Sequence, residues 1–299
     1  PVACAITHIA MDHMDRLGNT LAEIAADKSG IIKPGVPVVS SPQEPEAAKV
    51  IERAAAAAGA RLVRVSRAAG DADVPFELLD VGPGGTRVRV DLRRMPRGRS
   101  MELSCGLVGV HQAANCATAV AALELVSDRF PVSDAELREG LAAARNPGRF
   151  EIVQREPYIV VLDGAHNPDG AQSLAATIRA AIGNERPRVM LLGLSRDKDL
   201  DEMVRIIAPH ADYVVATAAT HTRSGARDPE EIVAAMKAAG VEARGAPAAE
   251  AVAAARAAAV TIGARSLVVA GSLYLVGQLR AEFVEPEERP EGGERTCRW

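Results

Sequence analysis

Residues 159–168 decide the fold, and they read IVVLDGAHNP. The four opening residues are aliphatic and mostly β-branched, which predicts a short buried strand. The polar residues and Pro that follow predict that this strand ends at Leu162 and that a helix begins soon after it. A strand that passes directly into a helix is the repeating unit of parallel α/β sheets.

The same unit recurs along the second half of the chain, where short β-rich runs alternate with helical segments. This alternation predicts right-handed βαβ units on a Rossmann-like, mostly parallel sheet, and Phe150–Gln154 can add an antiparallel edge strand. The strands are expected at Ile159–Leu162, Val189–Leu192, Tyr213–Ala216, Glu242–Gly245 and Leu267–Ala270. The helices are expected at Asp169–Ala181, Leu200–Ile207, Pro229–Ala239, Ala248–Val260 and Leu273–Phe283.

The first part of the chain mixes strand and helix signals. Capping boxes at Thr20 and Ser133 predict two helix starts, and glycines at 82–85 predict a hairpin within Phe76–Leu92. Further strands are expected at Val2–Thr7, Val36–Ser40, Arg61–Ser66 and Met101–Val108, and helices at 20–28, Glu46–Ala58, His111–Val126 and Ser133–Ala143.

The length of the chain and a break in its pattern of elements predict two domains. A chain of 299 residues is long enough for two domains, since a single hydrophobic core stops growing near 250–300 residues, and the pattern changes at Pro147-Gly148. We therefore expect one domain over residues 1–145 and a second over 146–284. Residues 285–299 are rich in Pro, Glu, Gly and Arg, which is typical of a disordered tail.

Composition argues against several classes of function. Aromatic residues make up 3% and the formal net charge is −4, so the chain lacks both the stacking platforms and the basic surface of a nucleic-acid binder. No run approaches the roughly 18 apolar residues of a membrane span. The scattered cysteines are typical of reduced thiols, and we expect a cytoplasmic protein without nucleic-acid or membrane partners.

The motif that follows Leu162 is the strongest candidate for chemistry. Ligands of open α/β sheets bind beyond the carboxyl ends of the strands, and helix N-termini attract anions. Asp163 can accept hydrogen bonds from a ribose or an amine, and His166 can hold a carboxylate or a phosphate. The alternative is that Asp163 and Asn167 only cap the helix, and the motif alone leaves both interpretations open.

A second candidate begins at residues 6–13, ITHIAMDH, and continues to Lys28. Histidines at the end of a strand beside carboxylates can ligate a metal, although a lone histidine is more often an ordinary surface or core residue. Lys28 alone would be a solvated lysine that favours the helix C-terminus.

Six motifs, taken in order, add a family resemblance. They are ITHIAMDHMDRLGNTLAEIAADKSGIIKPG at 6–35, VHQAAN at 110–115, NPGRF at 146–150, DGAHNP at 163–168, DKD at 197–199 and GSLY at 271–274. In order and spacing they resemble the folylpolyglutamate synthase / dihydrofolate synthase family of the Mur ligase superfamily. The resemblance covers nearly the whole chain up to about residue 283. It implies the C-terminal remainder of a P-loop ATPase domain followed by a glutamate ligase domain.

The resemblance also implies a metal site. His13 matches a magnesium-ligand histidine, and Lys28 matches a lysine that is carbamylated. Carbamylation turns a cation into a carboxylate, and Mg²⁺ prefers such hard oxygen ligands.

Further residues match the family's substrate-binding positions. Asn115, Arg149 and Asp163 match residues that contact ATP, and His166 and Ser272 match positions near the incoming glutamate. Lys198, in the DKD segment, corresponds to a lysine near the reaction centre of Mur ligases. The implied catalytic residues are therefore Lys28, Lys198 and His166.

One part of the family pattern is missing from the sequence. No G-x-x-x-x-G-K-[ST] loop is present, although such a loop supplies much of the charge stabilisation in phosphoryl transfer. The chain also opens at Pro1 within an apolar run. We therefore expect a fragment whose phosphate loop belongs before Pro1 and which is inactive alone.

The implied reaction of the whole enzyme is an ADP-forming amide ligation. ATP phosphorylates the terminal carboxylate of a folate, and L-glutamate attacks the acyl phosphate, with Mg²⁺ as cofactor and a monomer as the expected state. Two alternatives stay open at this point: another Mur-type amino-acid ligase, or a non-catalytic remnant that serves as an interaction module.

Overall fold

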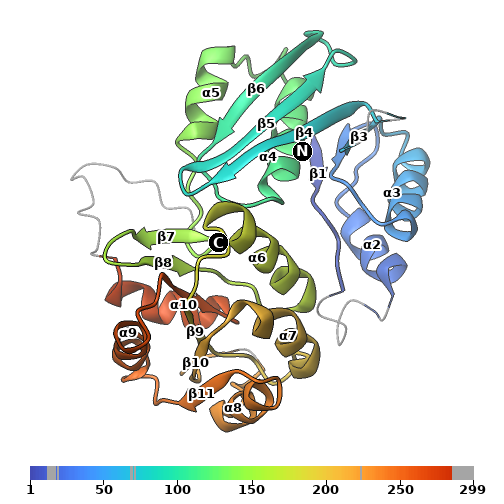
Figure 1. Ribbon diagram of the computed structural model, residues 1–299. Helices are drawn as coiled ribbons and strands as arrows, with labels where there is room; N and C mark the ends of the chain where they lie inside the picture. The colour runs from blue at the N-terminus through green and yellow to red at the C-terminus, as the bar shows by residue number, and fades with distance from the viewer. Residues whose placement is uncertain (12–17, 19, 68–69, 71, 223, 285–299) are drawn as a thin grey trace, which may run out of the picture.

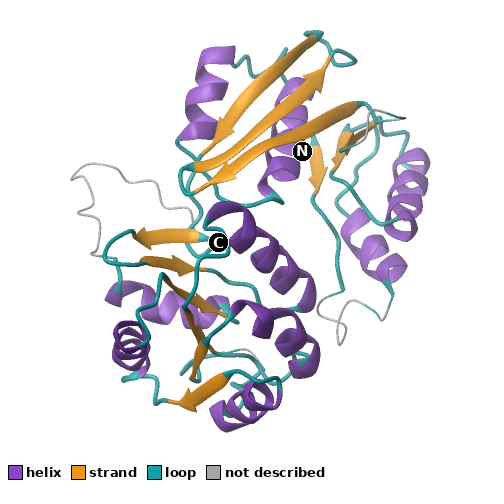
Figure 2. Cartoon of the chain, viewed as in Figure 1, coloured by secondary structure: helices purple, strands orange, loops and turns teal. Residues whose placement is uncertain are grey.

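The computed structural model describes residues 1–11, 18, 20–67, 70, 72–222 and 224–284. Within these residues the chain forms two α/β units, each built on a six-stranded sheet (Figure 1). The α/β class with mostly parallel sheets, expected from the sequence, is confirmed. Figure 2 shows helices lying against both sheets.

The first sheet is parallel at one end and antiparallel at the other. Its order is β1-β2-β3-β4-β5-β6, and the pairs from β1 to β4 are parallel whereas β4–β5 and β5–β6 are antiparallel. The strands are β1 (Cys4–Ile6), β2 (Val38–Ser40), β3 (Leu62–Ser66), β4 (Val74–Gly82), β5 (Gly85–Leu92) and β6 (Arg99–Cys105).

The helices of the first unit are α2 (Leu21–Ser29), α3 (Pro45–Ala57), α4 (Gln112–Leu125) and α5 (Asp134–Ala142). Both predicted capping boxes are present, because Thr20 exchanges hydrogen bonds with Glu23 and Ser133 does so with Glu136. Each box satisfies two backbone groups at a helix start that would otherwise lack partners.

Helix α4 is the central helix of this unit, and it packs against strands β1 to β6. Its buried face consists mainly of small residues such as Ala113, Ala117 and Ala121, each without exposed surface. Such a face lets the helix lie close to the sheet. The N-terminus of α4 is thereby fixed at the sheet edge that faces the second unit.

A buried carboxylate anchors the other end of α4. The side chain of Glu124 has no exposed surface and accepts hydrogen bonds from Arg97 Nε at 3.1 Å and Arg99 Nη2 at 2.8 Å. Burial opposes ionisation of Glu124, but the two guanidinium groups outweigh it and hold the pKa of this carboxyl below its ordinary value. Helix α4 is therefore tied to the connection between β5 and β6.

The second sheet is parallel except at one edge. Its order is β11-β10-β9-β12-β8-β7, and β7 pairs antiparallel with β8 as the sequence predicts. The strands are β7 (Glu151–Gln154), β8 (Ile159–Leu162), β9 (Arg188–Leu192), β10 (Tyr213–Ala216), β11 (Glu242–Gly245) and β12 (Ser266–Ala270).

Helices cover both faces of this sheet, which explains why its central strands β9 and β12 are buried at every position. Val161 packs with residues of α6, α7 and α8, whereas Val160 and Leu162 pack with residues of α9 and α10 (Figure 1). The helices are α6 (Pro168–Ala181), α7 (Leu200–Ile207), α8 (Pro229–Ala238), α9 (Ala251–Thr261) and α10 (Leu273–Leu279).

Most differences from the predicted elements are at their ends. The helix expected at Leu273–Phe283 stops at Leu279 and continues as a 3₁₀ turn over Arg280–Glu282. The strand expected to reach Val108 ends at Cys105, because the next backbone N–H, that of Gly106, donates to Leu141 O. The predicted tail, 285–299, lies outside the described residues. Across the part of the chain that is described, no helix has the length and apolarity of a membrane span.

We expect Glu124→Gln to destabilise the protein by about 3 kcal/mol, since it leaves two partly buried guanidinium groups without a carboxylate. Urea denaturation followed by circular dichroism measures this change. Glu102→Gln is the matched control, because Glu102 forms an exposed ion pair with Arg89 that is worth about 1 kcal/mol or less. Equal destabilisation by the two variants would contradict the anchoring role of Glu124.

Candidate active site between the two units

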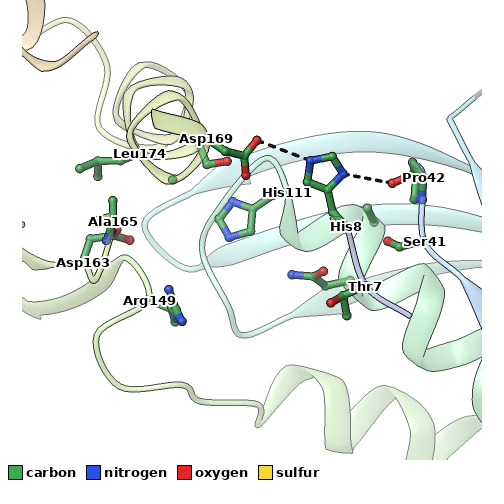
Figure 3. A pocket seen from close by; sticks show the side chains of 14 residues that line it. Thr7, His8, Ser41, Pro42, His111, Arg149, Asp163, Ala165, Asp169 and Leu174 are labelled. Atoms are coloured by element: carbon green, nitrogen blue, oxygen red, sulfur yellow. Dashed lines mark hydrogen bonds and ion pairs between the residues drawn. The ribbon is translucent and has the colours of Figure 1, made fainter. Parts of the chain in front are cut away.

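A cavity of about 320 Å³ lies between the two units (Figure 3). The first unit contributes residues that follow β1 and β2 and residues at the start of α4, and the second contributes residues around the end of β8 and the start of α6. The lining consists of Thr7, His8, Ser41, Pro42, His111, Ala114, Asn115, Arg149, Asp163, Ala165, Asp169, Gly170, Ser173 and Leu174. The cavity thus lies beyond the carboxyl ends of parallel strands, where such folds bind ligands.

Asp163 is buried at the end of β8, and both its carboxylate oxygens are hydrogen-bonded. Oδ2 accepts from the backbone N–H of Phe150 at 2.8 Å, and Oδ1 accepts from that of Ala165 at 2.8 Å. Burial raises the pKa of this carboxyl, and the two N–H donors and the nearby Arg149 oppose that rise. Asp163 therefore connects the strand end to the segment that joins the two units.

That joining segment has an unusual backbone. Phe150 has a φ of +44° and Gly148 a φ of +70°, and left-handed backbone is rare for a residue with a large side chain. The bond from Phe150 N–H to Asp163 holds this conformation, and Gly164 N–H donates to Gly148 O at 2.7 Å. The NPGRF and DGAHNP motifs are therefore hydrogen-bonded to each other, and these bonds flank Arg149 on both sides.

Asn167 has the capping role that the sequence left open, because its side chain accepts from Gly170 N–H at the start of α6. Asp163 has a different role and does not cap this helix. His166 Nδ1 lies 2.8 Å from Gly164 O, so the side chain is folded back onto its own loop. Ser272 caps α10 by accepting from the N–H groups of Tyr274 and Leu275.

Asn115 faces the cavity from the first unit and Arg149 faces it from the linker. Asn115 Nδ2 donates to Gln112 Oε1 at 2.9 Å, and among the described residues no hydrogen bond reaches its Oδ1. None reaches the guanidinium of Arg149 either. The cavity therefore presents an amide oxygen and a guanidinium group that are available to a ligand.

Two further histidines line the same cavity: His111, to which the sequence gave no role, and His8, which it offered only within the possible metal-ligating segment. Burial lowers the pKa of His111, with Arg149 as a further cause, so this ring is neutral at pH 7. His111 Nδ1 is buried without a hydrogen-bond partner among the described residues. The position of His111 in the VHQAAN motif could have indicated that it faces the site. A histidine directly before a helix that begins at a sheet edge lies on the side where such sheets bind ligands.

His8 joins the two units across the cavity (Figure 3). Its Nδ1 lies 3.2 Å from Pro42 O and its Nε2 lies 3.5 Å from Asp169 Oδ1. Both neighbours are acceptors, so the doubly protonated ring suits this place best. The Asp169 carboxylate is the main cause that raises the pKa of His8, and His8 in turn lowers the pKa of Asp169.

The predicted metal residues are only partly described. His13 lies outside the described residues. Lys28 lies in the last turn of α2, forms an exposed ion pair with Asp27 at 3.5 Å and lines a neighbouring cavity of about 380 Å³ together with His8, Asn167 and Asp169. No group of three His, Cys, Asp or Glu side chains suited to a metal occurs in the described residues.

The structure does not bring every nominated residue to a cavity. Among the described lining residues of the two cavities, Asn115, Arg149, Asp163 and Lys28 are present, whereas His166, Lys198 and Ser272 are absent. Lys198 is mostly buried and pairs with Asp197 at 3.2 Å. Asp169 was missed because a polar residue in the first helical turn is usually only solvated.

Family comparison supports the same assignment of the two units. The Mur ligase middle domain matches residues 1–123, and the Mur ligase glutamate ligase domain matches residues 148–273. These matches and the relatives below confirm the resemblance. The chain therefore belongs to the folylpolyglutamate synthase / dihydrofolate synthase family of the Mur ligases.

Among curated relatives, the dihydrofolate synthase/folylpolyglutamate synthase of Bacillus subtilis is 36% identical over 207 residues, which are 69% of this chain and 46% of the relative. The folylpolyglutamate synthase of Lacticaseibacillus casei is 35% identical over 205 residues, which are 68% of this chain and 45% of that protein. The Mycobacterium tuberculosis folylpolyglutamate synthase in complex with ADP and AMPPCP superposes with a TM-score of 0.82 at 28% identity, with 94% of this chain and 64% of that chain covered. The chain spans about half the length of these two curated relatives.

We expect the His8–Asp169 contact to stabilise the protein by about 0.5 kcal/mol, a small value because both side chains are about half exposed. His8 has a raised pKa, so its contribution is complete below the ordinary value of 6.5 and is lost as pH rises through the raised value. Asp169 has a lowered pKa, so its contribution is complete above 3.8 and is lost only at lower pH. The contact is therefore complete between about pH 4 and 6.5.

A double-mutant cycle with His8→Gln and Asp169→Asn, followed by urea denaturation at pH 6 and pH 8.5, measures this coupling. Glu44 and His111 also face the pair and stay unchanged throughout the cycle. The coupling energy should be larger at pH 6 than at pH 8.5. A coupling that is the same at both pH values would rule out the charged pair.

Proposed function

We propose that the protein is an ATP-dependent ligase that joins L-glutamate to a folate and forms ADP and phosphate. The observation that carries the proposal is the cavity between the units. Asn115, Arg149 and Asp163, which the family resemblance assigns to ATP, come from different elements and line this one cavity. A cleft between a middle domain and a glutamate ligase domain suits a reaction that must bring a nucleotide and an amino acid together.

The chain's own residues support the nucleotide side of this reaction. The amide oxygen of Asn115 can accept from an amino group of a base, and the guanidinium of Arg149 can donate to phosphate oxygens. Asp163 acts by positioning, since both its oxygens already hold backbone N–H groups. It keeps Arg149 at the cavity by fixing the residue that follows.

The proposed chemistry proceeds in two steps. A carboxylate oxygen of the folate attacks the γ-phosphorus of ATP, and the bond to the departing ADP breaks. The amino nitrogen of glutamate then attacks the acyl carbon and releases phosphate, while the amine gives up a proton. An enclosed cavity favours this sequence because water would hydrolyse the acyl phosphate.

Magnesium enters the proposal through the resemblance. His13 and a carbamylated Lys28 are the proposed ligands, and the bound metal would spread the charge of the transferring phosphoryl group. No step above depends on this metal. His166 and Ser272 remain proposed for glutamate and Lys198 for the reaction centre, although each makes local contacts in this structure.

The activity is tested by a ligation assay on the complete gene product. Incorporation of labelled L-glutamate into dihydropteroate or a tetrahydrofolate, with ADP release of equal amount, is the expected result. The 299-residue chain assayed in parallel should show no ADP release above a no-protein control. Glutamate incorporation into neither pteridine acceptor, with activity on another carboxylic acid, would instead identify a different Mur-type ligase.

We expect the 299-residue chain to bind ADP and Asn115→Ala to weaken that binding roughly tenfold, the usual effect of one lost hydrogen bond to a ligand. Isothermal titration calorimetry measures both dissociation constants. Asn184→Ala is the matched control, because Asn184 is exposed in the turn after α6 and lies outside the cavity. Equal loss of affinity in the two variants would remove Asn115 from the nucleotide site.

A further inference from the structure

A larger cavity, of about 540 Å³, lies on the linker between the two units. Its walls are the turn between β4 and β5, the loop that follows β6, the linker at 145–149, strand β7 and Arg280. Figure 1 shows the β4–β5 turn close to β7, and Arg155 of the second unit donates to Pro83 O of that turn at 3.1 Å. Both units therefore contribute to one concave surface.

The charge of this cavity is strongly positive, although the chain as a whole carries −4. Its charged lining residues are four arginines and one glutamate, Arg145, Arg149, Arg155, Arg280 and Glu151. Four cations against one carboxylate leave an excess of three positive charges. Like charges gathered in one concavity repel each other, and a bound anion relieves that repulsion.

Local contacts hold three of these guanidinium groups in place. Arg145 Nη1 donates to Ala142 O at 3.1 Å and to Ala144 O at 2.8 Å, and Arg155 is fixed by its bond to Pro83 O. Arg280 donates to both carboxylate oxygens of Glu151, at 2.7 to 3.1 Å. A guanidinium group has five N–H donors, so the contacts of Arg145 and Arg155 fix the side chains and leave donors for a ligand.

We infer that this linker cavity binds a small polyanion that carries phosphate groups. Guanidinium forks match the geometry of phosphate oxygens, and such charge-assisted hydrogen bonds are strong. The volume falls in the usual range of small-molecule sites. Because its walls belong to both units, the bound anion connects them directly, in a cavity that shares only Arg149 with the one that holds Asn115 and Asp163.

Pyrophosphate is the probe, and isothermal titration calorimetry at low ionic strength gives its affinity for the 299-residue chain. Arg155→Gln should weaken binding roughly tenfold, the effect of one lost charge-assisted contact. Arg155 is exposed, so this variant keeps the fold, which circular dichroism verifies. Arg205→Gln is the matched control, because Arg205 is an exposed arginine of α7 that pairs with Glu202.

A second arm places the anion. Arg145→Gln, at a residue that lines the linker cavity but not the cavity that holds Asp163, should weaken pyrophosphate binding as Arg155→Gln does. The proposal fails if either Arg155→Gln or Arg145→Gln binds pyrophosphate as tightly as the unaltered chain. It also fails if the tricarboxylate tricarballylate binds more tightly than pyrophosphate, since the ligand class would then not be a phosphate.

Discussion

The carboxylate of Asp163 holds the segment that joins the two units in its conformation. It accepts one backbone N–H from its own loop and one from Phe150, at the start of the second unit. These two bonds hold a left-handed residue in the linker and bring the loop after β8 against the linker. Arg149 lies between these contacts and lines both the candidate active site and the linker cavity. The position of one buried carboxylate therefore determines which side chains each cavity can present.

Contacts between the units differ from one end of the interface to the other. Close to the linker they are apolar, because Val81 and Val108 of the first unit join the hydrophobic cluster that contains Phe150. At the candidate active site they are polar, with His8 and Asp169 in contact at 3.5 Å. Apolar packing holds its strength across pH and salt, whereas exposed ion pairs do not. The units are therefore held firmly at the linker and more weakly at the cavity.

Much of the fold could be predicted from the sequence, because local patterns determine it. Alternating βα segments gave the second sheet, and capping boxes gave the starts of α2 and α5. Strand order could not be predicted, since it depends on pairing between distant residues. For the site, the motifs predicted ATP contacts for Asn115, Arg149 and Asp163; the three residues line one cavity, and their ATP role stays a prediction. The motifs could not indicate that both oxygens of Asp163 are taken by backbone groups, or that His8 meets Asp169, because both facts arise from tertiary contacts.

The position of β12 in the second sheet has a consequence for synthesis. Strand β12 is the last strand among the residues that the structure describes, yet it lies between β9 and β8 in the middle of the sheet. Until residue 270 has left the ribosome, β7 and β8 have no parallel neighbour that connects them to β9, β10 and β11. The nascent unit must therefore wait as two separate groups of strands with uncovered apolar edges, a state that chaperones recognise. The second sheet is therefore completed late in folding and in a nearly all-or-none step.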